Sequence, residues 1–321
     1  MQEYPPIPYG FGDSLNDYLV RVSQLRPIMK KGSSGCFHIF QASNATGQLR
    51  AVIWADTVDF RNGDFLKITG KIQNHREEAQ IVVNKWEVVR KGDIDPSYFL
   101  PTCSQPIERM LDEMIDYISQ VQSSDMQMLL TTMLLDDPTI AIPFQQAPAA
   151  KFHHHAYLGG LLEHSLAVAK RALGMALEGH LNRDLILAGA LLHDIGKIEE
   201  YSFIDSIEIV EIGNLAGHIA LGYYMVRRAI SRIPDFPSEL ATQLLHLILS
   251  HHGRNEWGSP VEPATSEALI VSAADLIDAQ LFQLSRAGED FPGERVTYSK
   301  SLNRWVLGNP HLPSQESYSY N

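Results

Sequence analysis

The residues with the clearest potential for chemistry are histidines and aspartates at the ends of predicted helices. In residues 191–197, LLHDIGK, an apolar helix runs into His193 and Asp194 and ends at the following glycine. An adjacent histidine and aspartate supply one imidazole nitrogen and one carboxylate, and the carboxylate can bridge two cations. His251 and His252 close the helix LLHLILSHHG in much the same way. The pattern therefore points to a metal site built from helix ends.

Three further candidates lie inside apolar helical segments. His164 occurs in GGLLEHSLAV and His218 in NLAGHIAL, although a histidine on an apolar helix is more often a satisfied core residue than a ligand. Asp275 occurs in ALIVSAADLIDAQL, where a buried carboxylate needs a metal or a charged partner because its desolvation is costly. No basic residue lies within one turn of Asp275 in the sequence. Histidine and aspartate sets with few cysteines suit Mn²⁺, Fe²⁺, Co²⁺ or Zn²⁺.

The elements that must position these residues are helices of the C-terminal two thirds of the chain. Three prolines mark residues 93–106 as a linker, and we predict an all-α domain over residues 107–290. Residues 138–148 are a looser, proline-rich stretch, and residues 291–321 an irregular C-terminal tail. The amphipathic or apolar helical segments are 107–121, 125–135, 160–178, 183–193, 217–232, 238–252 and 266–285.

Residues 13–92 have the alternating pattern of strands, after an N-terminal tail of residues 1–12. The clearest segments are 35–41, 49–54, 65–72 and 79–89, with turn residues between them. About five short strands without a long helix predict a small closed all-β barrel. FHIFQASNATGQLRAVIW, followed by NGDFLKITGKI, resembles an OB-fold of the nucleic-acid-binding type. Asn44 and Ala45 stand where members usually place an aspartate before the turn.

An OB-fold binds single strands through aromatic faces and a positively charged groove. Two of the candidates are aromatic, and for each of these a place in the barrel core is an equally weighted alternative. The remaining candidates are basic. The complete set is Phe40, Trp54, Arg50, Lys67 and Lys71.

Composition and charge limit the classes of function. The chain has 321 residues, of which 45% are hydrophobic, and 26 basic against 38 acidic side chains give a formal net charge of −12. Residues 1–95 carry 12 basic and 11 acidic groups, whereas residues 96–321 carry 14 and 27. This argues against nucleic-acid binding over the whole surface, but not against a local groove. No signal peptide or long apolar run is evident, so we expect a soluble cytoplasmic protein without a membrane partner.

The ligand candidates, taken in chain order over roughly residues 105–290, resemble those of the HD-domain metallophosphohydrolases. The resemblance implies a first metal held by His164, His193, Asp194 and Asp275. It implies a second metal at His218, His251 and His252, with Asp194 as the bridge. Two divalent ions are thus expected, with Mn²⁺ favoured and Co²⁺, Fe²⁺ or Zn²⁺ as alternatives.

The order of the domains resembles one family across almost the entire chain. An N-terminal OB-fold, a linker and an HD domain opened by AKFHHHAYLGGLLEHSLAV are similar to the YhaM-type 3′-to-5′ exoribonucleases. The resemblance implies a metal-dependent exonuclease that hydrolyses single-stranded RNA to mononucleotides, with single-stranded DNA as a second candidate substrate. It also suggests a homo-oligomer.

Basic residues near the ligands are candidates for phosphate contact. Lys197, one turn past the ligand pair, is placed to contact a phosphate oxygen, and with Asp194 it forms the predicted catalytic pair. Its alternative role is to cap helix-end carbonyls. Lys151, His154 and His155 precede the first ligand helix and could hold the scissile or an adjacent phosphate, with a solvated loop as the alternative.

Two other functions remain open from the sequence. The first is an HD phosphohydrolase of small or cyclic nucleotides, but residues 222–224 read GYY rather than the Gly-Tyr-Pro of HD enzymes that degrade cyclic dinucleotides. That function would also leave the barrel without an evident role. The second is a nucleic-acid-binding regulator with a structural HD domain. The presence of all seven ligand-type residues argues against a purely structural HD domain, because buried polar clusters without a metal would destabilise the fold.

Overall fold

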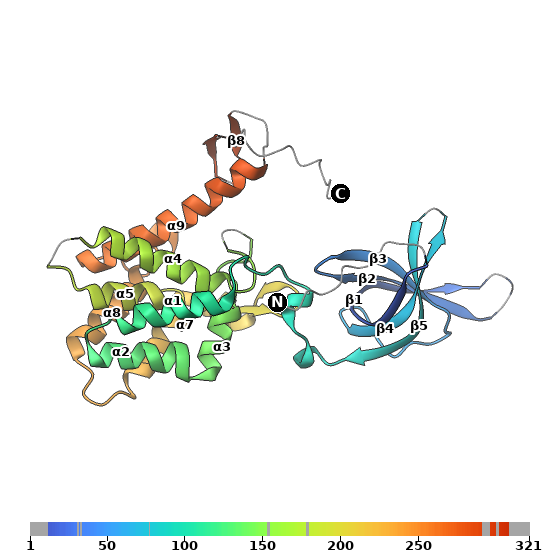
Figure 1. Ribbon diagram of the computed structural model, residues 1–321, viewed down its shortest axis with the longest axis horizontal. Coiled ribbons are helices and arrows are strands. Elements are labelled where there is room, and N and C mark those ends of the chain that lie inside the picture. The colour runs from blue at the N-terminus through green and yellow to red at the C-terminus, as the bar shows by residue number, and fades with distance from the viewer. Residues whose placement is uncertain are drawn as a thin grey trace. The chain divides into compact units, whose positions relative to one another are not determined.

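The computed structural model describes residues 12–30, 32, 34–76, 78–152, 155–177, 180–290, 296–299 and 302–307. They form two compact units, one of strands and one of helices (Figure 1). The first unit contains the described residues up to Thr102 together with Phe203–Ser206, and the second contains the rest. The division at Thr102 falls within the stretch predicted as a linker.

The first unit is a closed five-stranded barrel in the order β1-β2-β3-β5-β4. Its β3 and β5 pair in parallel, and the other neighbouring strands are antiparallel. This is the architecture of an OB-fold, which confirms the predicted fold class. The strands are β1 (Ser14–Met29), β2 (Cys36–Asn44), β3 (Gly47–Ile53), β4 (Phe65–His75) and β5 (Glu78–Val89).

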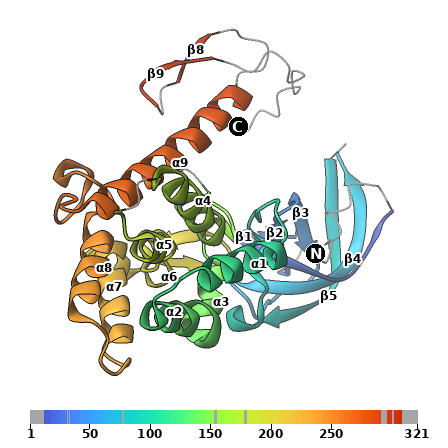
Figure 2. The ribbon, with the colours of Figure 1, turned by 60° about the vertical axis from the view of Figure 1, so that its left-hand side comes forward.

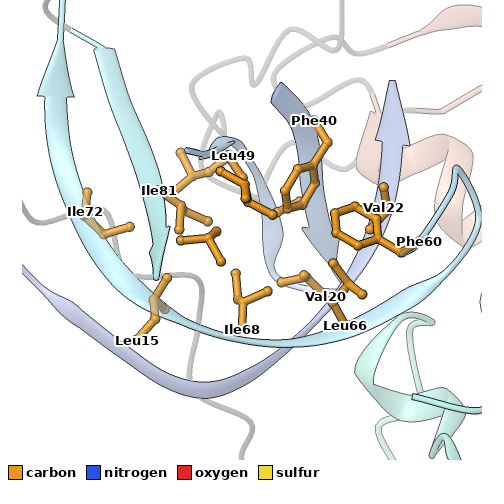
Figure 3. Close-up of a cluster of buried hydrophobic side chains, with 14 residues drawn as sticks. Leu15, Val20, Val22, Phe40, Leu49, Phe60, Leu66, Ile68, Ile72 and Ile81 are labelled. Atoms are coloured by element: carbon orange, nitrogen blue, oxygen red, sulfur yellow. The ribbon is translucent and has the colours of Figure 1, made fainter. Parts of the chain in front are cut away.

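The barrel interior follows from the alternation along each strand. On β3, Leu49, Ala51 and Ile53 belong to the buried core, whereas the intervening Arg50 is exposed. Figure 3 shows Leu49 with core side chains contributed by the other strands. In the β2–β3 turn, Asn44 Oδ1 accepts hydrogen bonds from the amide and hydroxyl of Thr46, at 2.9 and 2.7 Å. Asn44 therefore supplies turn chemistry of the kind that an aspartate provides at such a position.

The second unit is helical and has α5 near its centre. All eight residues from Leu185 to Leu192 on α5 are buried, and the helix packs against α2, α4, α8 and α9 (Figure 2). Asn182 caps the start of α5 by accepting a hydrogen bond from the amide of Leu185 at 3.0 Å. The helices are α1 (Ile107–Ser119), α2 (Ser124–Thr131), α3 (Pro138–Gln146), α4 (Gly160–Met175), α5 (Arg183–Leu192), α6 (Lys197–Glu200), α7 (Glu211–Ile230), α8 (Ser238–Ser250) and α9 (Ser266–Asp290).

The structure differs from the sequence expectations at several places, among them the following three. The proline-rich stretch forms α3, because Asp137 caps its start by accepting from the Thr139 amide, and Pro138 occupies the first turn. Two strands, β6 (Tyr201–Phe203) and β7 (Ile207–Ile209), pair between α6 and α7. The tail predicted as irregular contains β8 (Thr297–Ser299) paired with β9 (Arg304–Val306).

One helix among the described residues, α9, is long and apolar enough to cross a membrane by length and composition alone. Its residues Ala268, Val271 and Ala274 are buried, and the helix packs against α4, α5 and α8. Core helices of globular proteins have the same composition.

Candidate metal centre

The helices bring all seven predicted ligand residues to one place. Each residue lies on a helix or at the turn that directly follows one, so rigid elements hold every donor. The residues are His164 on α4, His193 and Asp194 after α5, His218 on α7, His251 and His252 after α8, and Asp275 on α9.

The first group of donors contains His164, His193 and Asp275, whose ligand atoms lie within 4.8 Å of one another. The Nε2 atoms of the two histidines are 3.2 Å apart. Asp275 Oδ1 lies 3.1 Å from Nε2 of His164. Asp194 joins this group through Oδ2, which is 3.5 Å from Nε2 of His164 and 3.3 Å from Nε2 of His193.

The second group contains His218, His251 and His252. The Nε2 atoms of His218 and His252 are 3.3 Å apart. Asp194 presents its other oxygen here, because Oδ1 lies 3.4 Å from Nε2 of His218 and 3.5 Å from Nε2 of His251. The two oxygens of Asp194 therefore face two different groups of histidines, which is the arrangement of a carboxylate between two cation sites.

Backbone carbonyls orient three of the histidines. Nδ1 of His193 lies 2.8 Å from the carbonyl oxygen of Ala190, and Nδ1 of His251 lies 2.7 Å from that of Ile248. Both contacts reach back three residues, so the two helix ends use the same local geometry. Nδ1 of His252 lies 3.0 Å from the carbonyl of Trp257. A ring that donates its Nδ1–H to a carbonyl leaves the Nε2 lone pair free for a metal.

Carboxylates orient two more histidines. Nδ1 of His164 lies 2.7 Å from Oδ2 of Asp278, and Nδ1 of His218 lies 3.3 Å from the Glu200 carboxylate. Asp278 is itself held by Arg171, whose guanidinium lies 2.9 Å from Oδ1. Histidine ligands commonly have such carboxylate partners, which fix the ring and raise its basicity.

The centre is buried, and two of its polar atoms lack hydrogen-bond partners among the described residues. His164, His193, Asp194 and His251 are 2% exposed or less. Among the residues that the structure describes, Asp194 Oδ1 and His251 Nε2 have no hydrogen-bond partner. Buried polar atoms are normally paired, so this convergence of acceptors fits a divalent cation.

The electrostatics of the centre favour the metal-binding protonation states of Asp194, His251 and His252. Burial would raise the pKa of Asp194, but Lys197 and His193 outweigh it and hold that pKa well below its ordinary value. Burial lowers the pKa of His251 and of His252. The carboxylate is therefore ionised and these two imidazoles are neutral near pH 7, as metal binding requires.

Glycines allow α7 to approach the α5–α6 turn. The backbone at Gly217 has φ +73°, so α7 bends immediately before His218. A Cβ atom on Gly196 would lie 2.0 Å from the carbonyl oxygen of His218. Glycine at position 196 therefore lets the turn that carries Asp194 pack directly against the helix that carries His218.

The residues predicted to contact phosphate differ in how close they lie to the centre and in their partners. The ammonium of Lys197 contacts Oδ2 of Asp194, and the side chain is 7% exposed. Lys151 pairs with Glu208 at 2.6 Å. His155 is buried, and its Nε2 lies 3.2 Å from Asp278 Oδ2, so it adjoins the centre through that carboxylate. His154 lies outside the described residues.

The barrel candidates divide into core and surface. Phe40 is 2% exposed and packs edge-to-face on Phe60 inside the barrel, so the structure corrects its expected role in stacking bases (Figure 3). Trp54 is 61% exposed and lies against Phe37, with ring centroids 4.6 Å apart. The three basic candidates are also exposed: Arg50, Lys67 and Lys71.

Sequence reasoning missed the residues that support the ligands. Asp278 follows Asp275 by three positions on α9, a spacing that places both on one helix face. Glu200 follows Lys197 by the same interval. Recognising these spacings could have predicted the carboxylates. No sequence signal marked Arg171 or Trp257.

Comparison with known proteins identifies similar sequences. The model of the HD domain family matches residues 161–280, and TraI_2, a family that its description relates to helicases, matches residues 103–186. Proteins named 3′-5′ exoribonuclease YhaM are similar over nearly the whole chain. That of Bacillus subtilis (strain 168) is 31% identical, covering 88% of this chain and 90% of its own length. That of Listeria monocytogenes serotype 4b (strain CLIP80459) is 30% identical, covering 94% of this chain and 97% of its own length.

Two solved structures each match a quarter of the chain. The second OB-fold domain of replication protein A from Methanococcus maripaludis is 16% identical, with a TM-score of 0.20, over 25% of this chain and 85% of its own. A replication protein A heterotrimer bound to single-stranded DNA has the same identity and TM-score, over 25% of this chain and 59% of its own.

Proposed function

The chain belongs to the YhaM family of 3′-5′ exoribonucleases, and from this membership we propose that it is a metal-dependent enzyme that removes mononucleotides from the 3′ end of single-stranded RNA. The observation that carries the metal dependence is the position of Asp194. Its two oxygens face separate groups of histidines, and its Oδ1 is buried without a hydrogen-bond partner among the described residues.

Two divalent cations are proposed for the centre, with Mn²⁺ favoured. His164, His193 and Asp275 would hold one, His218, His251 and His252 the other, and Asp194 would contact both. Bound cations there would neutralise charge on the phosphoryl oxygens. They would also lower the pKa of a bound water molecule, so that it could lose a proton near neutral pH.

The burial of the side chains of the centre favours one direction of substrate entry. His164, His193 and His251 are buried, whereas His218 and Asp275 are half-buried. A phosphodiester would therefore approach from the side of the half-buried residues. Lys197 contacts Asp194 from within the centre, and we propose that its ammonium also stabilises negative charge on the scissile phosphate.

The barrel is proposed to hold the strand upstream of its 3′ end. The exposed ring of Trp54, which lies against the half-buried Phe37, offers an aromatic surface on which bases of any identity can stack. Arg50, Lys67 and Lys71 are exposed on the same barrel and provide positive charge for phosphates. Single-stranded DNA offers the same two features and is the second candidate substrate.

The proposal is tested with one RNA oligonucleotide labelled in turn at its 5′ and 3′ ends. With Mn²⁺, the 5′ label should yield a descending ladder, and the 3′ label should appear at once as a mononucleotide. A circular RNA of the same sequence is the matched control and should remain intact. Hydrolysis of cyclic or small nucleotides without degradation of the oligonucleotide would contradict the proposal. Binding without hydrolysis would favour a regulatory protein instead.

A further inference from the structure

A cavity of about 530 Å³ lies beside the second group of histidines. Its lining includes Gly253, which directly follows His252, and Ser272 and Leu276, which flank Asp275 on α9. A Cβ atom on Gly253 would lie 2.7 Å from the Ser272 hydroxyl, so this wall joins the end of α8 to α9. The cavity is therefore lined by close sequence neighbours of two half-buried ligand residues, His252 and Asp275.

The lining of this cavity combines aromatic and aliphatic groups with charges of both signs, because Glu256 and Glu262 accompany Arg254 and Glu256 lies 3.5 Å from the Arg254 guanidinium. Trp257 is 50% exposed, and the guanidinium of Arg254 lies over its ring at 5.1 Å from the centroid. Leu269 is 62% exposed and Leu276 39%. Large apolar side chains that stay in water beside a polar centre mark a binding surface. Nothing in the metal chemistry requires these side chains.

Trp257 is also linked to the centre through its backbone. Its carbonyl accepts the hydrogen bond from Nδ1 of His252, at 3.0 Å. The backbone that carries the indole is thus fixed relative to a proposed metal ligand, and the Arg254 guanidinium packs on the ring. A group stacked on this ring would be held at a defined distance from the centre.

We propose that the cavity receives the 3′-terminal nucleoside of the RNA, with its base stacked on the face of the half-exposed Trp257 ring that the Arg254 guanidinium does not cover. This inference rests on the proposed exonuclease function, since an enzyme that cleaves the last phosphodiester must hold the departing nucleotide next to the reacting phosphate. The volume lies within the range of roughly 300–1,000 Å³ typical of small-molecule sites. Stacking tolerates all four bases, as an enzyme that must release each nucleotide in turn requires.

The test uses two 5′-labelled RNA oligonucleotides that differ only at the 3′-terminal residue, which carries a base in one and is abasic in the other. The first cleavage is measured in a single turnover with Mn²⁺. The wild-type protein should cleave the base-bearing RNA roughly 10- to 100-fold faster, the range expected for one stacked base. Trp257→Ala should reduce this preference to about one, and Trp257→Phe should retain most of it.

Two further variants complete the design. Trp305→Ala removes another exposed tryptophan, which is 70% exposed on β9, and should keep the wild-type preference. If Trp257→Ala cleaves neither RNA, Leu269→Asp decides the question, because Leu269 is exposed and its replacement by a carboxylate beside the base should lower the preference.

The outcomes separate this inference from the proposed function. A wild-type protein that degrades both RNAs at equal rates would overturn the assignment of the cavity and leave the exonuclease function intact. An unchanged preference in Trp257→Ala, or in Leu269→Asp when that variant decides, would also overturn it. A wild-type protein that degrades neither RNA would instead contradict the proposed function.

Discussion

Nε2 of His251 lies 3.5 Å from Oδ1 of Asp194, and in the described part of the chain neither buried atom has a hydrogen-bond partner. Nδ1 of His251 faces the carbonyl of Ile248, so its Nε2 is the lone-pair side of the ring. Two lone-pair donors turned toward each other in a buried site are stabilised by a cation between them. This relationship is the one expected of a site that binds a divalent cation.

Metal content should depend on which donor is removed. We expect about two Mn²⁺ per wild-type chain, because two donor groups share Asp194. Loss of the imidazole in His252→Ala should leave about one Mn²⁺ per chain, because the first group of donors keeps all its ligand atoms. The measurement is equilibrium dialysis followed by elemental analysis. His246→Gln is the matched control, since His246 lies on the same helix but bonds to the amide of Ala264. Equal metal content in wild type and His252→Ala would refute the assignment of the second group.

Asp278 should act on metal affinity through His164. Asp278→Asn keeps the shape of the side chain but removes the charge that orients the ring, so Mn²⁺ affinity should fall roughly 10- to 100-fold. Isothermal titration calorimetry measures this directly. Glu239→Gln, at an exposed position on α8, should have no effect. An Asp278→Asn protein that binds Mn²⁺ like wild type would show that the carboxylate only supports packing.

The stability of the metal-free protein should fall with rising pH. Burial opposes protonation of His164, but hydrogen bonds with Asp275 and Asp278 outweigh it and raise the His164 pKa from 6.5 to about 9. A pKa raised on folding gives stability that is fully present below pH 6.5 and is lost as pH rises through about 9. Thermal unfolding in EDTA should therefore show a lower Tm at pH 9 than at pH 6.5, and His164→Gln should reduce this difference. A wild-type Tm that is constant or rises over this interval would be inconsistent with the charged His164.

Trp54 should contribute to binding of long strands. Trp54→Ala removes an exposed stacking surface, so affinity for a single-stranded RNA should fall roughly 10- to 100-fold. Fluorescence anisotropy in EDTA measures binding without cleavage. Val88→Ala, which trims another exposed apolar residue of the barrel, should leave affinity unchanged. If both variants bind RNA like wild type, the Trp54 surface is not where the strand lies.

Several of the candidate ligands could be found in the sequence because they belong to a local pattern. His193 and His251 end apolar helices, and both point Nδ1 at the carbonyl three residues earlier, so similar sequences produced similar geometry. Asp275 was recognisable as a carboxylate without a basic neighbour in an apolar helix. Tertiary packing then had only to bring these helix positions together.

Residues whose roles depend on which way a side chain points, or on a contact between two elements, were harder to predict. Phe40 and Trp54 both occur in alternating segments, and only the closed barrel decides that Phe40 points inward and Trp54 outward. Arg171 meets Asp278 across two helices, α4 and α9, which no short-range pattern reveals. Proline at position 138 suggested irregular structure, but at the start of a helix capped by Asp137 it favours α3.

The most direct test of the account is a time course of 5′-labelled single-stranded RNA with Mn²⁺, comparing the wild-type protein with Asp194→Asn. The substitution keeps the shape of the side chain but removes the charge that both donor groups face, so activity should fall by at least about 100- to 1,000-fold. The account predicts a descending ladder from the wild-type protein and an intact substrate with the variant. An equally fast ladder from Asp194→Asn, or no cleavage by the wild-type protein in Mn²⁺, would contradict it.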